Sequence, residues 1–142
     1  MVGDAPLIEL VLRKYERPEN SDKKALLRMF LLSVGLIQPG DSRDTIVPIF
    51  DILMQATKTK ESMKVGDICA RLEKGAAPSN VRRHLRRLMA IKLVEKADGG
   101  YRIAESFDLP LAFKYVTQKY VLSDVLERIE IYAGALKEAY GP

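Results

Sequence analysis

A run near the middle of the chain, from Asn80 to Leu88, constrains the fold more than any other segment. On an α-helix, which turns by about 100° per residue, the run separates into two faces. One face carries Arg82, Arg83, Arg86 and Arg87. The opposite face carries Val81, His84, Leu85, Leu88 and Met89. The pattern predicts a helix that packs one side on a core and exposes the other to solvent.

The basic face has no acidic neighbours in the sequence. From Lys74 to Val94 there is no Asp or Glu, although the 142-residue chain has a net charge of only +4. Packing does not require such a face, because Lys/Glu pairs solvate a helix equally well and repel less. A polyanion such as a phosphate backbone does call for it. The localised charge therefore indicates a docking face, and a solvated face without a binding role is the alternative.

Length and composition exclude several classes of protein. A chain of this size fits one domain with or without helical extensions, and it can bury a core without disulfides or metals. Cys69 is the only cysteine, so no intrachain disulfide forms, and a lone cysteine suits a reducing compartment. The start lacks a signal-peptide pattern, and the longest apolar stretch is too short to span a bilayer. We expect a soluble, cytoplasmic protein without a membrane partner.

Catalytic and metal-binding motifs find little support. The chain has no phosphate-cradling Gly-rich loop, no HExxH and no paired-Cys motif. We therefore expect no enzymatic activity, no cofactor and no metal site. The single histidine, His84, is expected to be a partly buried packing residue with one satisfied nitrogen. Cys69 is expected to be a small core residue, with a redox-sensing thiol as the alternative.

The first third of the chain predicts three helices. One spans Pro6 to Glu16, and a second runs from a cap at Asn20 or Ser21 to about Gly35. A third starts near Ser42. It tolerates a proline in its first turns, where a missing N–H does little harm.

The middle of the chain alternates helices with turns and strands. The elements expected there are a helix over Val65 to Lys74 that Gly75 ends, a basic helix from Pro78 to about Lys92, a strand over Leu93 to Lys96, a turn over Asp98 to Gly100 and a return strand over Tyr101 to Ile103. The two strands form a hairpin.

The C-terminal part carries two apolar seams at helical spacing. The first seam is Leu109, Phe113, Val116 and Tyr120, and the second is Leu122, Leu126, Ile129, Ala133, Leu136 and Tyr140. The phase slips by two residues near Val121, and Ser123 is a plausible cap. We therefore expect a kink or two separate helices there. Pairing with a second subunit would bury these seams, and packing on the N-terminal helices is the alternative.

The order of helix, short helix, tight turn, basic helix and hairpin resembles the winged helix-turn-helix transcriptional regulators of the ArsR and MarR kind. The likeness covers about 42–104. It implies a mainly α fold with a small β-hairpin, divided into an N-terminal helical extension (1–41), a winged helix-turn-helix domain (42–105) and a C-terminal helical segment for dimerisation (106–142).

The resemblance also implies a function. The chain would bind double-stranded DNA sequence-specifically as a homodimeric transcriptional regulator, paired through Leu109 to Tyr140 and the N-terminal helices. Arginine can hold guanine, and asparagine adenine, with two hydrogen bonds. The implied DNA-binding residues are Ser79, Asn80, Arg82, Arg83, Arg86 and Arg87 on the basic helix, and Lys96 and Arg102 beside the hairpin.

The hairpin departs from the regulators, because its tip carries an acid, Asp98, rather than a Lys or Arg. A hairpin that probes the minor groove deeply is therefore not expected. This leaves a rival function open, in which the domain is a protein-interaction adaptor that docks an acidic partner. A regulator gated by an effector or by Cys69 oxidation is a second rival.

Overall fold

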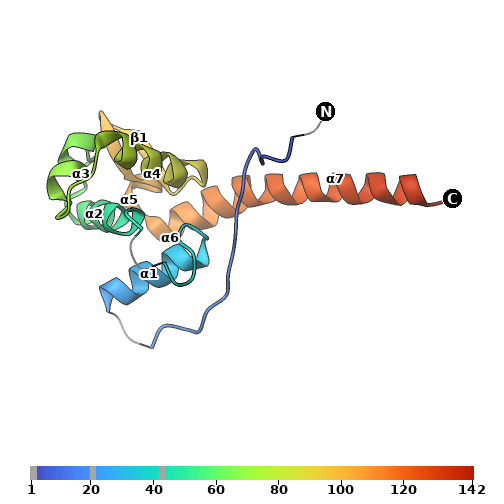
Figure 1. Ribbon diagram of the computed structural model, residues 1–142, viewed down its shortest axis with the longest axis horizontal. Coiled ribbons are helices and arrows are strands. Elements are labelled where there is room, and N and C mark those ends of the chain that lie inside the picture. Colours follow the sequence, from blue (N-terminus) through green and yellow to red (C-terminus); the bar gives the residue numbers. More distant parts are fainter. Residues whose placement is uncertain (1–2, 20–21, 42–43) are drawn as a thin grey trace.

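A computed structural model describes residues 3–19, 22–41 and 44–142. As predicted, the fold is mainly helical with one antiparallel hairpin (Figure 1). The elements are α1 (Lys23–Ser33), α2 (Ile46–Thr59), α3 (Val65–Arg71), α4 (Pro78–Ala90), β1 (Val94–Ala97), β2 (Gly100–Ile103), α5 (Ala104–Phe107), α6 (Leu109–Leu111), the π-helix η1 (Ala112–Leu122) and α7 (Ser123–Tyr140).

The core lies where α1, α2, α3, α4 and the hairpin meet. Leu31, Ile49, Phe50, Leu85 and Ile103 are each at most 1% exposed. They come from the apolar stripes of the predicted helices and from the second strand. Burial of these stripes fixes which face of each element turns outward, because a helix with one apolar side must cover it.

The middle of the chain confirms the predicted order, with small shifts at the ends. Gly75 has a φ of +67°, which suits the turn after α3, and Pro78 is the first residue of α4. α3 ends at Arg71 rather than Lys74, and α4 ends at Ala90 rather than Lys92. These differences of three and two residues both lie at helix ends, which fray.

The hairpin has a two-residue turn. Asp98 and Gly99 have φ values of 52° and 77°, as the tight hairpin turns require, while Gly100 pairs with Ala97 inside the ladder. The segment before α3 adds a bridge, because the N–H groups of Met63 and Tyr101 each donate to the other residue's carbonyl at 2.8 Å. The hairpin is therefore anchored to the helical core.

The predicted helix over Pro6 to Glu16 is wrong. This segment has no helical residue and lies across the end of α1, where the Arg13 N–H donates to the Ser33 carbonyl at 2.9 Å. The Arg13 guanidinium also donates to the Leu32 and Ile37 carbonyls. A Cβ at Gly35 would lie 2.6 Å from the Val11 Cβ, so this glycine permits the close approach. Tertiary contacts override the local periodicity here.

The starts of α1 and α2 involve residues that sequence reasoning did not select. The predicted caps Asn20 and Ser21 and the predicted start Ser42 lie outside the described residues. At α1 the cap is Asp22, whose carboxylate accepts a hydrogen bond from the Lys24 N–H. The carboxylate of Asp44 accepts one from the Ile46 N–H at the start of α2.

The change predicted near Val121 is present as two helical elements of different winding, the π-helix η1 ending at Leu122 and α7 beginning at Ser123, but the backbone stays helical between them and the predicted cap is wrong. Ser123 is helical and does not cap α7; its hydroxyl donates to the Lys119 carbonyl instead. A π-helix bonds each residue to the fifth along, so it absorbs the phase slip without a kink. The same wide winding leaves Tyr120 59% exposed and buries Thr117 instead.

The C-terminal helix α7 projects from the globular part (Figure 1). None of its residues is buried. The alternative in which the seam packs on the N-terminal helices is therefore wrong for α7, whereas the first seam does contact α1, through the Phe113 and Phe30 rings with centroids 6.5 Å apart. Within residues 3–19, 22–41 and 44–142, no helix combines the length and the hydropathy needed to cross a membrane.

Candidate nucleic-acid interface

The basic helix α4 lies with its apolar side on the core. Val81, Leu85 and Leu88 are 0% exposed. On the opposite side Arg82, Arg83 and Arg86 are exposed. The burial of the three apolar residues thus fixes the helix rotation, and the rotation presents the arginines to solvent.

Ser79, Arg82 and Arg86 form the outer part of this surface, which we call the arginine ridge. All three are exposed. Among the described residues, no carboxylate lies within ion-pair distance of Arg82 or Arg86. Their charge is therefore screened by solvent alone, and both guanidinium groups are available to a ligand.

A second group on the same helix is held by the protein itself. Arg87 donates to the Leu36 carbonyl at 2.5 Å, and its Nη1 lies 3.8 Å from Asp44 Oδ2. Arg83 donates to Asn80 Oδ1 at 3.0 Å. The predicted DNA-contact residues thus divide into an exposed set and a tethered set, and Arg87 belongs to the tethered set.

His84 is at the centre of the tethered set and is only 2% exposed. Its Nδ1 is 3.0 Å from Arg87 Nη1, and its Nε2 is 3.2 Å from Arg83 Nη2 and 3.9 Å from Asp44 Oδ1. A neutral imidazole has one acceptor nitrogen, so only one of the two guanidinium groups can donate to the ring in either tautomer. The expected packing role of His84 is confirmed, with burial deeper than predicted.

The surroundings of His84 lower its pKa below the usual value of 6.5. Burial is the largest cause and the positive charge of Arg83 the second; Arg87 acts in the same direction, whereas Asp44 opposes the shift. His84 is therefore neutral in the folded protein near pH 7. A neutral ring spares the cluster a third positive charge beside the two arginines.

The lowered pKa predicts a pH dependence of stability. Between the folded pKa and 6.5 the unfolded chain binds a proton at His84 that the folded chain does not. The contribution of neutral His84 to the free energy of unfolding is thus complete above pH 6.5. It is lost as the pH falls below that value. We expect the melting temperature to drop between pH 7 and pH 5, and His84→Asn to flatten this part of the curve. An equal drop in the variant would assign the effect to other groups.

The two predicted residues near the hairpin differ in availability. Lys96 is exposed, with its Nζ 5.9 Å from the centre of the Tyr101 ring. Arg102 instead donates from Nε to Glu95 Oε1 at 3.0 Å, across the strand pair, and its guanidinium lies 5.1 Å from the Phe107 ring centre. Lys96 can meet a phosphate directly, whereas Arg102 is engaged within the fold.

Sequence reasoning missed Asp44 as a partner of the basic helix. It lies forty positions before His84, in the segment that leads into α2, so no local spacing connects the two. A lone acid before a helix most often accepts from a backbone N–H at the start of that helix, and Asp44 does so from the Ile46 N–H, although the N-cap of α2 is Thr45. Only the tertiary fold brings it to Arg87.

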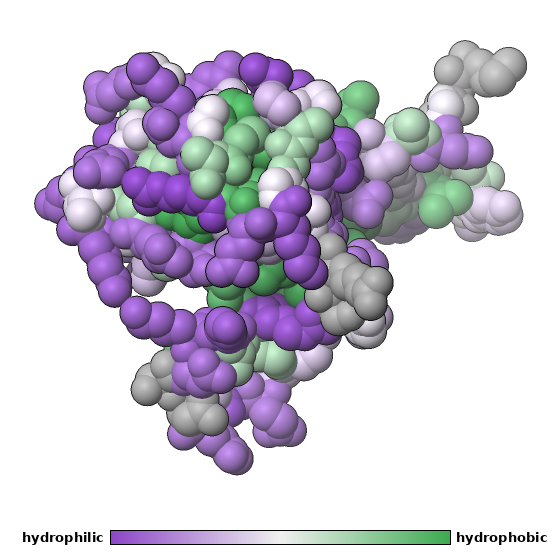
Figure 2. Space-filling view, turned by 60° about the vertical axis from the view of Figure 1, so that its left-hand side comes forward, coloured by the Kyte–Doolittle hydropathy of each residue, from purple (hydrophilic) through white to green (hydrophobic). Residues whose placement is uncertain are grey.

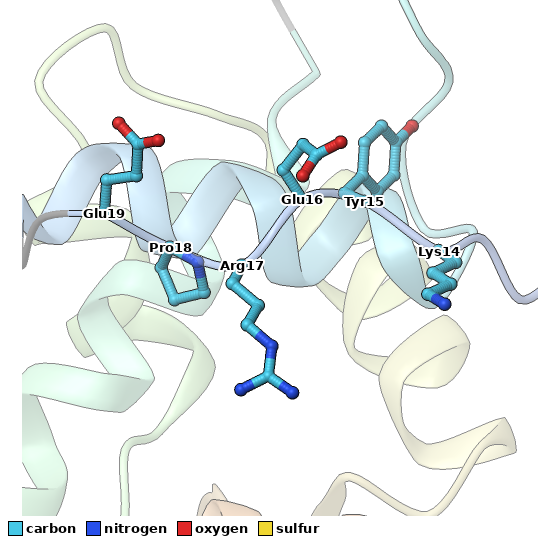
Figure 3. A pocket seen from close by; sticks show the side chains of 6 residues that line it. All are labelled: Lys14, Tyr15, Glu16, Arg17, Pro18 and Glu19. Carbon is cyan, nitrogen blue, oxygen red and sulfur yellow. The ribbon is translucent and has the colours of Figure 1, made fainter.

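Two concave features lie beside the N-terminal segment. One, of about 350 Å³, lies between this segment and the end of α4 and includes Arg87. The other, of about 550 Å³, is lined by consecutive residues of one extended segment, Lys14 to Glu19. Figure 3 shows their side chains pointing to both sides of this segment rather than toward a common centre. Among the described residues, no three His, Cys, Asp or Glu side chains are placed to hold a metal ion. Cys69 is partly buried.

The surface of the globular part in the view of Figure 2 is mainly hydrophilic, with hydrophobic residues visible between the charged ones. Comparison of this chain with protein-family models, with curated proteins and with solved structures gave no match.

Proposed function

We propose that the chain is a winged helix-turn-helix protein that binds double-stranded DNA sequence-specifically as a homodimer and regulates transcription. In this assignment α2, α3 and α4 form the helical motif, and β1 and β2 form the wing. The observation that carries the proposal is the arginine ridge, exposed and unneutralised on a helix whose other face is fixed in the core. A convex cationic helix of this kind fits the major groove.

The geometry of the ridge suits base recognition. Arg82 and Arg86 are four residues apart and hence about 6 Å apart along the helix axis. Each guanidinium can donate two hydrogen bonds to guanine O6 and N7. Ser79 lies in the first turn, where its exposed hydroxyl and the positive end of the helix dipole favour a phosphate. Lys96 on the hairpin would meet the backbone beside the groove.

The tethered set supports the same function indirectly. Arg87 links α4 to the Leu36 carbonyl and Asp44, so it fixes the helix against the segment between α1 and α2. A recognition helix held in one orientation loses little entropy on binding. We assign Arg87 and His84 to positioning of the ridge and not to DNA contact.

The direct test identifies the DNA and then measures affinity. Fragments that co-purify with the protein from its own cells are sequenced, and the enriched duplex is titrated by fluorescence anisotropy against a scrambled duplex. We expect tighter binding to the enriched duplex. Equal affinity for both duplexes would remove the sequence-specific part of the proposal.

Salt should weaken this binding steeply. If each protomer sets Lys96 and the exposed Arg83 on phosphates while Arg82 and Arg86 contact bases, a dimer displaces the counterions of four phosphates, which predicts a slope of about −3.6 in log K against log salt. Anisotropy titrations between low and moderate salt measure the slope. A slope near zero would mean that neither α4 nor the hairpin meets phosphates.

A protein-interaction adaptor is the second candidate function. Two observations favour it: the hairpin tip carries Asp98, and Arg102 is paired with Glu95 instead of being available to a phosphate. An acidic partner would then dock on the arginine ridge. Pull-down from nuclease-treated lysate separates the candidates, because a nucleic-acid partner is lost and a protein partner is retained.

A further inference from the structure

The apolar face of α7 has no partner within the chain. Leu126, Ile129 and Leu136 are 51%, 57% and 58% exposed. They belong to the seam Leu122, Leu126, Ile129, Ala133, Leu136 and Tyr140, in which apolar residues recur at alternating spacings of four and three. Exposed apolar surface on this scale marks an interaction site.

We propose that this seam pairs with the same seam of a second copy of the chain, as an antiparallel two-stranded coiled coil. The inference rests on the dimer of the proposed function and specifies its interface. The alternating spacing averages 3.5 residues, which is the repeat of helices that coil around each other. Asp124, Glu127 and Glu138 lie on the opposite side of α7, which disfavours an anionic membrane as the occupant.

The residues that flank the seam determine the direction of pairing. One flank is apolar. It consists of Val125, Tyr132 and Ala139, each of which directly precedes a seam residue in the sequence. The other flank is polar and consists of Ser123, Glu130 and Lys137. Parallel helices place one flank against the other, so Tyr132 would meet Lys137 of the second copy. Antiparallel helices place like flanks together, and the apolar flank is then buried.

The seam itself fits the antiparallel arrangement. With the two-fold axis at position 131, all six seam residues find partners: Leu122 faces Tyr140, Leu126 faces Leu136, and Ile129 faces Ala133. Ala133, the only small residue of the seam, then faces the large Ile129, which favours dense packing. In a parallel pair Ala133 would face its own copy, and two small side chains would leave a void.

The chain offers a matched pair of variants for testing the interface. Ile129 lies in the seam and is 57% exposed, whereas Ile131 lies on the opposite side of the same helix and is 54% exposed. We expect the full-length protein to be a dimer by light scattering, Ile129→Glu to be a monomer and Ile131→Glu to remain a dimer. Unchanged far-UV circular dichroism of the globular part confirms that the variants fold. Loss of the dimer in both variants, or in neither, would overturn the seam assignment.

Cysteine cross-linking determines the direction of pairing in a Cys69→Ser background. In the antiparallel pair the two copies of residue 132 lie on the same flank, offset by about 3 Å along the axis, whereas the two copies of residue 126 are about 15 Å apart. A bismaleimide with a short spacer should therefore link Tyr132→Cys, whose two copies are separated mainly by the distance of about 8–10 Å between the helix axes, and leave Leu126→Cys unlinked. The reverse result means a parallel pair and overturns the orientation.

The outcomes also distinguish this inference from the proposed function. A wild-type chain that is monomeric at every concentration overturns the dimer. If such a monomer still binds the enriched duplex through α4, the recognition surface survives and only its pairing fails. If the antiparallel dimer forms and no duplex binds, the interface stands and the DNA-binding proposal fails.

Discussion

Replacing both Arg82 and Arg86 with alanine should abolish sequence-specific binding to the enriched duplex. Each guanidinium that reads a guanine is expected to contribute ~1–3 kcal/mol. At 1.4 kcal/mol for each factor of ten, the double variant loses roughly 30-fold to 20,000-fold in affinity for each protomer that contacts the duplex. Both residues are exposed, so their removal leaves the core intact and the loss reflects binding alone. Anisotropy titration at one fixed salt concentration measures it.

The control for this prediction removes the same charge elsewhere. Arg17 and Arg128 are exposed and lie outside α4, so Arg17→Ala with Arg128→Ala lowers the net charge equally. We expect this variant to bind nearly as tightly as the wild type. If both double variants lost affinity to the same extent, the general field of the protein rather than the ridge would be responsible, and groove recognition by α4 would be excluded.

Replacing Phe50 with alanine should cost about 3–5 kcal/mol of unfolding free energy, which is the usual range for a buried phenylalanine. Its side chain is 1% exposed, and its ring stacks on Phe30 with centroids 5.7 Å apart and planes 10° apart. Phe30 in turn meets the edge of the Phe113 ring at 6.5 Å. Chemical denaturation followed by circular dichroism measures the loss.

The contacts among these three aromatic rings also connect α1 and η1 to α2. Phe30 is on α1, Phe50 on α2 and Phe113 on η1, so the substitution loosens the contact between the motif and the helix that leads to α7. Tyr115 is a matched control, because it is an aromatic residue of η1 with 49% exposure. Tyr115→Ala should change stability little, and a large loss there would mean that η1 contacts more of the chain than its exposure indicates.

The elements from Ile46 to Ile103 were readable from sequence because local signals agree with the tertiary fold. Pro78 opens a helix and Asp98-Gly99 closes a hairpin through backbone preferences that neighbours do not alter. The segment from Pro6 to Glu16 shows the opposite case. Its helical spacing is real, but Arg13 gains more from carbonyls at the end of α1 than a short isolated helix gains in water.

The candidate site was predictable in part. Helical angles placed Arg82 and Arg86 outward, and the structure agrees, because the apolar side of α4 is in the core. The same angles could not show that Arg87 is tethered, since its partners Leu36 and Asp44 come from distant segments. The path of η1 was also hidden, because helical spacing was read at 3.6 residues per turn, whereas η1 is wound more widely.

In the proposed antiparallel dimer, the length of the arm formed by η1 and α7 would determine the distance between the two α4 helices. With the axis at position 131, the two Leu122 residues stand about 27 Å apart along the coil. A homologue with one heptad fewer in this arm would bring the two α4 helices of the dimer closer by about 10 Å. This shift corresponds to about three base pairs of duplex. The number of helical turns in the arm, rather than any base contact, would then determine the length of DNA between the two half-sites.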